Sequence, residues 1–342
     1  MPALPTETAR TTRRAVPTFP SCKSRESCLK MDLSSYTPCR LCPRQCATDR
    51  LAGVPGVCGE TAELRIASYG PHMGEEPCFS GTRGSGAIFF SGCPCHCFFC
   101  QNWQISNAHG KGDAFSPDEF HRLALGLIEL GVHNLNFVTP DHFWPHIEAL
   151  CARLRDEGVK IPFLFNSSGY QLPSMISRYA AQMDIFLPDF KFADPVLARL
   201  VMRDERYPEI ALESLRLMVA EKGFLEPFDP TGTDLAQRGV LVRHLVLPES
   251  IENTLRVLDL LREEFGRWLP LSLMSQYTPI PAAQSRPPFD RHLSAAEYQT
   301  AVDHAQELGF ENLLIQPLAA TDDFLPDFEK PRPFRGNPPP EP

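Results

Sequence analysis

Four cysteines lie within eight residues of one another in the segment Cys93-Pro94-Cys95-His96-Cys97-Phe98-Phe99-Cys100. Three of them, Cys93, Cys97 and Cys100, have the spacing C-x3-C-x2-C. Three thiolates at this spacing can hold three irons of a 4Fe–4S cluster and leave the fourth iron open. An open iron can bind the amino and carboxylate groups of a methionine moiety. The segment therefore predicts chemistry on a molecule bound at an iron–sulfur centre.

Cys95 is a fourth thiol in the same loop and raises an alternative. Four cysteines could fill all four iron sites and leave no open position. Because Cys95 and Cys97 are only two positions apart in a tight loop, we expect their side chains to diverge and Cys95 to bind no iron.

A second group of cysteines precedes this loop, with the spacing Cys39-x2-Cys42-x3-Cys46-x11-Cys58. Four thiolates can form a tetrahedral zinc site or hold a second iron–sulfur cluster, and a loop of unligated cysteines is the third possibility. The chain has twelve cysteines, and their short spacings suit metal ligation better than disulfides. We therefore expect a protein of the reducing cytoplasm.

The composition excludes several classes of protein. A net charge of -9 argues against a nucleic-acid-binding surface. No apolar stretch is long enough to span a membrane, and no signal peptide with an apolar centre is visible. A hydrophobic fraction of 43% in 342 residues is enough for a substantial core.

Short apolar runs alternate with amphipathic stretches after residue 84, which predicts an α/β fold with a parallel sheet. Strands are expected at 87–90, 135–138, 161–165, 184–187, 240–246, 271–274 and 313–315. Helices are expected to begin after Ser116, Ser250 and Ser294, each acting as an N-cap, and a longer helical insert is expected over 194–222. Because the cysteine loop follows the first of these strands, it should lie at the carboxyl end of the sheet, where α/β barrels bind ligands.

The expected organisation has four parts. Residues 1–38 lack periodicity and should be disordered, and 39–80 form a cysteine-rich module. Residues 81–318 form the catalytic core, and 319–342 form a proline-rich tail. Met31 is an alternative start, which would make Cys22 and Cys28 incidental.

The cysteine loop, with its aromatic residue before the last cysteine, resembles the radical SAM superfamily. Several further segments resemble the PflX-type group, whose members are related to pyruvate formate-lyase activating enzymes. These segments are Gly74-Glu75-Glu76-Pro77, Asn136-Phe137-Val138-Thr139-Pro140, Asn166-Ser167-Ser168-Gly169-Tyr170, Leu187-Pro188-Asp189-Phe190-Lys191, Arg243-His244-Leu245-Val246-Leu247-Pro248 and Met274-Ser275-Gln276-Tyr277. The quartet Cys39, Cys42, Cys46 and Cys58 also matches that group, so the resemblance covers about residues 39–318.

The resemblance implies a partial (β/α)6 TIM-like barrel with an N-terminal cysteine-rich metal-binding extension. Cys93, Cys97 and Cys100 would be the ligands of the 4Fe–4S cluster, and Phe99 would contact the adenine of S-adenosylmethionine. The remaining cofactor-binding positions would be Thr139, Asn166, Ser168, Asp189, Lys191, Arg243 and Gln276. The glycine-rich element that usually receives the cofactor's amino group is absent around Thr139. Glu75 and Glu76 are candidates for acid–base groups, or else for salt bridges or a helix cap.

The implied function is that of a radical SAM enzyme, an oxidoreductase that forms a 5′-deoxyadenosyl radical and abstracts hydrogen from a substrate. Kinship suggests a glycyl residue of a partner enzyme as one possible substrate, and flavodoxin or ferredoxin as the electron donor. The alternative is a non-catalytic iron–sulfur or zinc protein that acts as an electron carrier or scaffold. The two differ in whether the protein fills all four iron sites. Function must be decided from the site, because a fold alone does not determine it.

Overall fold

The computed structural model describes residues 31–107, 110–318, 325–330 and 332–334. Most of the segment expected to be disordered (1–38), with Cys22 and Cys28, lies outside the described residues, as does most of the expected tail 319–342. Tyr36, within the described part of the first segment, is fully buried and forms a β-bridge with Cys39.

The larger sheet has a parallel core of five strands. In spatial order these are β2 (Ser85–Phe90), β4 (Leu135–Val138), β5 (Phe163–Ser167), β6 (Ile185–Pro188) and β7 (Gly239–Val240). Their residues are almost all buried, as expected for strands that are covered on both faces. The carboxyl ends of these strands therefore meet at one edge.

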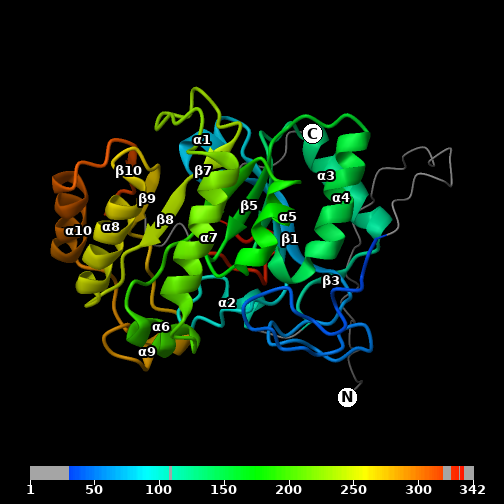
Figure 1. Ribbon diagram of the computed structural model, residues 1–342, viewed down its shortest axis with the longest axis horizontal. Helices are drawn as coiled ribbons and strands as arrows, with labels where there is room; N and C mark the ends of the chain where they lie inside the picture. Colours follow the sequence, from blue (N-terminus) through cyan, green and yellow to red (C-terminus); the bar gives the residue numbers. More distant parts are fainter. Residues whose placement is uncertain (1–30, 108–109, 319–324, 331, 335–342) are drawn as a thin grey trace, which may run out of the picture. The chain divides into compact units, whose positions relative to one another are not determined.

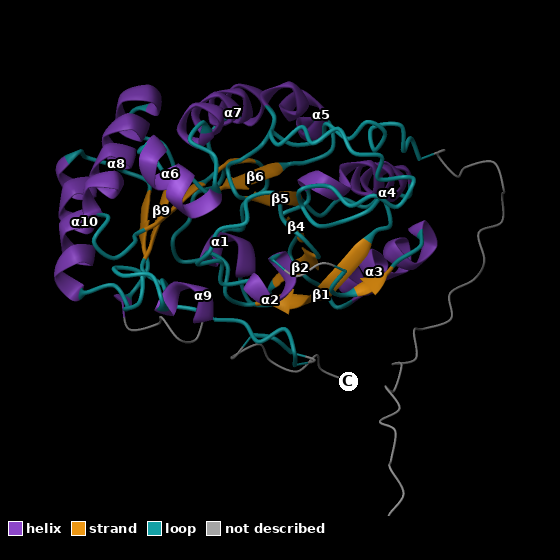
Figure 2. Ribbon diagram, turned by 90° about the horizontal axis from the view of Figure 1, so that it is seen from below, coloured by secondary structure: helices purple, strands orange, loops and turns teal. Residues whose placement is uncertain are grey.

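A second parallel sheet contains β8 (Val242–Leu245), β9 (Leu271–Met274) and β10 (Leu313–Ile315). A single bridge between Asp189, directly after β6, and Arg243 in β8 connects the two sheets. Seen from below, the strands follow an arc with the longer helices on its outer side (Figure 2). The chain is thus an α/β protein with a mostly parallel sheet, consistent with the partial barrel that the resemblance implies.

The helices alternate with the strands (Figure 1). The longer ones are α3 (Pro117–Glu129), α4 (Trp144–Asp156), α6 (Pro195–Met202), α7 (Tyr207–Lys222), α8 (Ile251–Phe265) and α10 (Ala295–Glu307). The shorter ones are α1 (Pro77–Ser80), α2 (Trp103–Ser106), α5 (Ile176–Ala180), α9 (Pro281–Gln284) and the 3₁₀ turns η1 (Asp141–Phe143) and η2 (Pro173–Met175). Ser294 forms the predicted capping box with Glu297. Ser116 is the predicted N-cap of α3, and it also forms a capping box with Glu119.

The structure divides one predicted helical segment into two helices and contradicts one predicted helix cap. The insert over 194–222 is two helices, because Arg203 adopts a left-handed conformation (φ 60°) and ends α6. Ser250 precedes α8 but makes no side-chain cap; its hydroxyl donates to the carbonyl of Pro248 instead.

Two antiparallel strands extend the larger sheet beyond β2 and were absent from the sequence prediction. β1 (Arg65–His72) pairs with β2, and β3 (Asp113–Ala114) pairs with β1. The expected boundary between 39–80 and 81–318 falls between the paired strands β1 and β2. Within the described ranges, no helix is long and apolar enough to cross a membrane.

Candidate active site

A cavity of about 630 Å³ lies at the carboxyl ends of the parallel strands. Loops that leave β2, β4, β5, β6, β9 and β10 supply part of its wall, and β8 supplies Arg243 and Leu245. Every residue predicted for the cluster and the cofactor lines it: Cys93, Cys97, Phe99, Cys100, Thr139, Asn166, Ser168, Asp189, Lys191, Arg243 and Gln276. The structure therefore brings these positions together at one place.

The three cysteines of the C-x3-C-x2-C loop lie close together at one end of the cavity. None of them forms a disulfide, and Cys93 and Cys97 are buried. Burial raises the pKa of Cys97 to about 12, and the charges of Cys100 and Cys93 also raise it, against the opposing effect of Lys191. Three clustered thiols with raised pKa values become thiolates readily only when a metal replaces their protons.

The hydrogen bonds of these thiols suit metal-bound sulfurs. The hydroxyl of Ser106 donates to Cys100 Sγ at 3.2 Å, and the amide of Cys95 donates to Cys93 Sγ at 3.4 Å. Among the described residues, no three cysteine, histidine or carboxylate side chains converge closely enough to hold a single metal ion. Three thiols beside an open cavity are the number of protein ligands that a 4Fe–4S cluster with one open iron requires.

Cys95 also lines the cavity. Its thiol donates to the hydroxyl of Ser168 at 3.1 Å, and its hydrogen bond to Cys93 is the largest cause of the raised pKa of Cys93. The Cys95 thiol thus has a hydrogen-bond partner in the loop after β5, as expected for a cysteine that binds no iron. It also stays within hydrogen-bonding distance of Cys93.

The loop that carries these cysteines is held in an uncommon conformation. His96 has φ 51°, and its ring nitrogen Nε2 contacts the carbonyl of Val57. Thr139, at the end of β4, has φ 54°. Residues without glycine's freedom adopt such angles mainly where the surrounding structure enforces them, often at functional sites.

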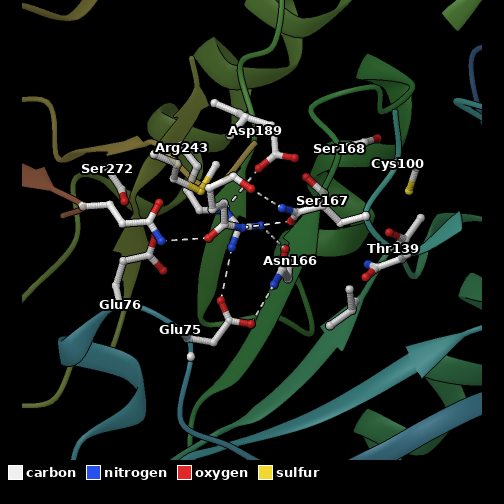
Figure 3. Close-up of a pocket in the computed structure, with 18 of the residues that line it drawn as sticks. Glu75, Glu76, Cys100, Thr139, Asn166, Ser167, Ser168, Asp189, Arg243 and Ser272 are labelled. Atoms are coloured by element: carbon white, nitrogen blue, oxygen red, sulfur yellow. Dashed lines mark hydrogen bonds and ion pairs between the residues drawn. The ribbon is translucent and has the colours of Figure 1, made fainter. Parts of the chain in front are cut away.

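Arg243 is the centre of a polar network at the other end of the cavity (Figure 3). Its Nε donates to Asp189 Oδ1 at 3.1 Å, its Nη1 to Glu75 Oε2 at 3.1 Å, and its Nη2 to Asn166 Oδ1 at 2.6 Å. Glu75 also accepts hydrogen bonds from Asn136 at 2.9 Å and Asn166 at 3.2 Å. The network joins β4, β5, β6 and β8 to the loop before α1.

Asp189 lies between two cations, Lys191 and Arg243. Burial favours its neutral form, but the charges of Lys191 and Arg243 outweigh burial and lower its pKa. Burial lowers the pKa of Lys191, and the charges of Asp189 and the Cys97 thiolate more than reverse that effect. An ionised carboxylate and a positive ammonium therefore face the cavity beside the cysteine loop.

Sequence reasoning gave Glu75 and Glu76 no firm role. Glu75 forms a salt bridge with Arg243, which is one of the three roles predicted for it. Burial raises the pKa of Glu76. The positive charge of Arg243 opposes this rise, and the negative charge of Glu75 adds to it. The Oε2 atom of Glu76 is buried without a hydrogen-bond partner among the described residues, and Glu76 lines the cavity. In the sequence, the feature that points to Glu75 and Glu76 is their position directly before a helix that begins with proline, in Gly74-Glu75-Glu76-Pro77.

Aromatic and amide side chains complete the wall. Phe99 packs edge-on against Phe98 and Tyr277, at centroid distances of 5.5 Å and 5.7 Å. Gln276 donates to Gln101 Oε1 at 3.0 Å and accepts from Gln316 at 2.8 Å. This amide chain connects the cysteine loop to the ends of β9 and β10.

The quartet Cys39, Cys42, Cys46 and Cys58 does not line the cavity. It lies directly behind the cysteine loop, since the amide of Cys93 donates to the carbonyl of Cys58 at 3.1 Å.

Comparisons with known proteins find a matching sequence family, a curated relative and similar solved structures. Residues 87–224 match the sequence model of the radical SAM superfamily. This range contains the cysteine loop, Thr139, Asn166, Ser168, Asp189 and Lys191, whereas Glu75 and Arg243 lie outside it. A curated relative, an uncharacterized protein of Methanocaldococcus jannaschii, is 24% identical over 292 residues, which cover 83% of this chain and 79% of the relative.

Among solved structures, the chain is similar to methylornithine synthase, with a TM-score of 0.47 and 15% identity over 68% of this chain and 63% of that one. It is also similar to Streptococcus suis SuiB bound to the precursor peptide SuiA, with a TM-score of 0.44 and 12% identity over 69% of this chain and 49% of that one. The chain thus spans less than two thirds of the length of each of these solved chains.

Proposed function

Because residues 87–224 form a radical SAM superfamily domain, we propose that this protein is an enzyme that cleaves S-adenosylmethionine reductively and uses the resulting radical to abstract hydrogen from a substrate. The observation that carries the proposal is the position of three clustered, non-disulfide thiols at the end of one strand-end cavity. Cys93, Cys97 and Cys100 would hold the 4Fe–4S cluster. When bound, that cluster supplies one electron and an open coordination site.

The residues of this chain would bind and orient the cofactor. Phe99, at the cysteine end of the cavity, offers a flat apolar surface for the adenine. Asp189 and Lys191 offer one anionic and one cationic group near the cysteine loop, suited to the amino and carboxylate groups of the methionine moiety. Thr139, Asn166, Ser168 and Gln276 provide uncharged hydrogen-bonding groups around the remaining wall.

Arg243 would position other groups rather than react. Its three hydrogen bonds hold Glu75, Asp189 and Asn166 in fixed orientations. Such an arrangement keeps polar groups in place when water leaves the cavity. The unpartnered Oε2 of Glu76 would then be available to a polar group of a bound substrate.

We further propose a PflX-type, activase-like reaction on a glycyl residue of a partner enzyme. The sequence resemblance supports it, and the cavity is lined on one side by the loop Gly74–Pro77, which lies outside the superfamily domain. A carbon–hydrogen bond of the glycyl residue would break, the hydrogen atom would complete 5′-deoxyadenosine, and the unpaired electron would remain on the glycyl carbon. A one-electron protein such as flavodoxin or ferredoxin would supply the reducing electron, in a cytoplasmic setting.

Anaerobic reconstitution tests the proposal. With dithionite and S-adenosylmethionine, the loaded protein should release 5′-deoxyadenosine and methionine. Cys97→Ala should abolish the product, whereas Cys151→Ala should retain it, because Cys151 is buried in α4 away from the cavity. Absence of product from a fully loaded wild-type cluster would contradict an enzyme and favour the electron-carrier alternative.

The substrate class has its own test. Incubation with a glycyl radical enzyme labelled with deuterium at its glycines should transfer one deuterium into 5′-deoxyadenosine. Formation of unlabelled 5′-deoxyadenosine alone would keep the radical chemistry and refute the glycyl substrate.

A further inference from the structure

The last described part of the chain lies against the wall of the cavity. It comprises residues 325–330 and 332–334, and we call it the C-terminal strap. Phe334 is one of the residues that line the cavity. Figure 1 shows the strap in red close to α2, and hydrogen bonds join the two. This part of the expected proline-rich tail is therefore in direct contact with the candidate site.

The strap covers apolar side chains on the face of the larger sheet that borders the cavity. They form one cluster: Ala87, Phe89, Ile105 and Val138. Phe89 and Val138 also line the cavity, whereas Phe90 lies on the opposite face and packs against Phe143. Among the described strands, β10 lies at the edge of its sheet and pairs with β9 alone, so no strand closes the barrel beside β1 and β2. Without the strap, this apolar face would be open to water.

Two phenylalanine rings attach the strap to this face. The rings of Phe328 and Phe334 pack against the ring of Phe89, with centroids 5.5 Å and 5.2 Å away. Phe334 also packs against the ring of His72 at 4.2 Å. Phe89 is only 6% exposed, whereas both rings of the strap are partly exposed. The strap therefore shields the sheet while its own anchoring rings stay within reach of solvent.

A side-chain amide of α2 holds the backbone of the strap. The amide of Phe328 donates to Gln104 Oε1 at 2.8 Å, and Gln104 Nε2 donates to Asp327 Oδ1 at 3.3 Å. Asp327 also folds the strap on itself, since its amide donates to the carbonyl of Pro333 at 2.8 Å and its carboxylate pairs with Lys330 at 3.0 Å. The strap is thus a small folded loop that presents one backbone amide and two rings to the barrel.

These contacts are of the kind by which proteins bind peptides. Hydrogen bonds to the main chain of a peptide supply affinity for any sequence, and apolar sites for its side chains supply specificity. Leu325 packs against the main core and anchors the start of the strap. Because the rings of Phe328 and Phe334 are only partly buried, the part beyond Leu325 can detach without unfolding of the barrel. Another peptide with a free amide and an aromatic side chain could then occupy the same contacts.

We propose that the C-terminal strap occupies the binding groove of a peptide substrate, and that the incoming peptide displaces it. The groove is formed by His72, Phe89, Gln104, Ile105 and Val138. A peptide bound there continues into the cavity, because Phe89 and Val138 belong to both. The identity of the peptide as the substrate rests on the proposed function, whereas the groove and its occupation by the strap do not.

The groove is tested with a fluorescein-labelled synthetic peptide of residues 327–334 and full-length protein reconstituted without oxygen. Phe328→Ala/Phe334→Ala should bind the peptide about tenfold more tightly than wild type, because its own strap competes less well for the groove. Glu329→Ala is the matched control and should bind like wild type, since its side chain is exposed and its backbone amide makes the bond to Asp327. Equal affinities of the double variant and wild type, or binding to neither, would overturn the proposal.

Two further variants keep the test decisive if the double variant lacks the circular dichroism of wild type. Asp327→Ala leaves both rings in place and loosens only the strap loop, so it should bind the peptide about threefold more tightly than wild type. Adding Gln104→Ala to Asp327→Ala should weaken binding about fivefold, because the peptide loses the acceptor for its amide. A gain in affinity that Gln104→Ala does not reduce would place the peptide elsewhere and refute the groove.

The link to the substrate is tested in turnover. With a synthetic peptide that contains the glycyl loop of a glycyl radical enzyme, Asp327→Ala should reach half-maximal 5′-deoxyadenosine formation at about threefold lower peptide concentration than wild type. The same peptide dependence in both proteins would refute displacement by the substrate. If the strap variants bind the peptide more tightly while wild type makes no 5′-deoxyadenosine, the groove stands and the proposed function falls.

Discussion

Arg243 Nη1 lies 3.1 Å from Glu75 Oε2, although 168 positions separate the two residues in the chain. Both side chains are largely buried, 15% and 7% exposed. This ion pair connects β8 to the loop before α1 and so determines where Glu75 and Glu76 lie along the cavity wall. The cysteine end and the polar end of the cavity are thus held together by segments on either side of residues 87–224, the range that matches the family model.

Glu75→Gln should destabilise the protein by about 2 kcal/mol, because Arg243 loses one of its two buried counter-charges while Asp189 remains. Urea unfolding under anaerobic conditions measures the change. Glu63→Gln is the control, since Glu63 is 51% exposed and pairs with Arg65 at the surface, where an ion pair contributes about 0–1 kcal/mol. Equal losses in the two variants would show that the Glu75 pair adds no more than a surface pair.

The alternation of strands and helices was predictable because buried parallel strands are short apolar runs. β4, β9 and β10 lie where the sequence placed them, at Leu135–Val138, Leu271–Met274 and Leu313–Ile315. β1 was missed because Arg65–His72 contains Gly70 and Pro71 and has no regular alternation of apolar residues. Its pairing with β2 is decided by tertiary contact.

The residues of the site were predictable as positions at strand ends, but their partners were not. Asp189 and Lys191 are near in sequence and do form an ion pair. Glu75 and Arg243 pair only because the loop before α1 crosses the ends of β4, β5 and β8, a path that no local pattern encodes. The backbone hydrogen bond between Cys93 and Cys58 was likewise not predictable from a local pattern. It depends on how the quartet folds against the cysteine loop.

The variant Cys95→Ala tests whether Cys95 binds iron as a fourth ligand or binds none. We expect it to retain the iron content and the 5′-deoxyadenosine yield of wild type, because its thiol has Ser168 as a partner. Iron analysis and product chromatography, with Cys97→Ala run in parallel, provide the measurement. If Cys95→Ala loses iron and Cys97→Ala does not, then Cys95 is a ligand and Cys97 is not.

His244 should make the protein less stable in mild acid. Its ring is fully buried, with Nδ1 donating to the carbonyl of Phe190 at 2.7 Å and Nε2 accepting from the hydroxyl of Thr254 at 3.0 Å. Burial lowers its pKa to about 4, against smaller opposing effects of the Phe190 carbonyl and Asp189, and Lys191 lowers it further. The folded protein therefore keeps the ring neutral.

The direction of this pH effect on stability follows from the number of protons that the folded and unfolded chains bind. Between an unfolded pKa of about 6.5 and the folded value, the unfolded chain binds the proton and the folded chain does not, so stability falls as pH falls through this window. From pH 7.5 to 5.5 the loss of stability should be about 1 kcal/mol larger in wild type than in His244→Gln, because His142 and His146, whose pKa values burial also lowers, contribute equally to both proteins. Asp141, whose pKa burial raises to about 6, acts with the opposite sign in both proteins and cancels in the difference. Equal losses of stability in wild type and His244→Gln between these two pH values would contradict the assignment.

Two of the three serines that precede long helices, Ser116 and Ser250, provide a matched pair for the last prediction. Ser116 Oγ accepts from the amide of Glu119 at 3.3 Å, and Glu119 accepts from the amide of Ser116 at 2.9 Å, whereas Ser250 makes no such bond to α8. Ser116→Ala should therefore cost about 1 kcal/mol of unfolding free energy, and Ser250→Ala less than about 0.5 kcal/mol. Neither should change 5′-deoxyadenosine formation, because neither serine lines the cavity. Thermal and urea unfolding measure the difference, and equal losses would show that the cap of α3 does not determine its stability.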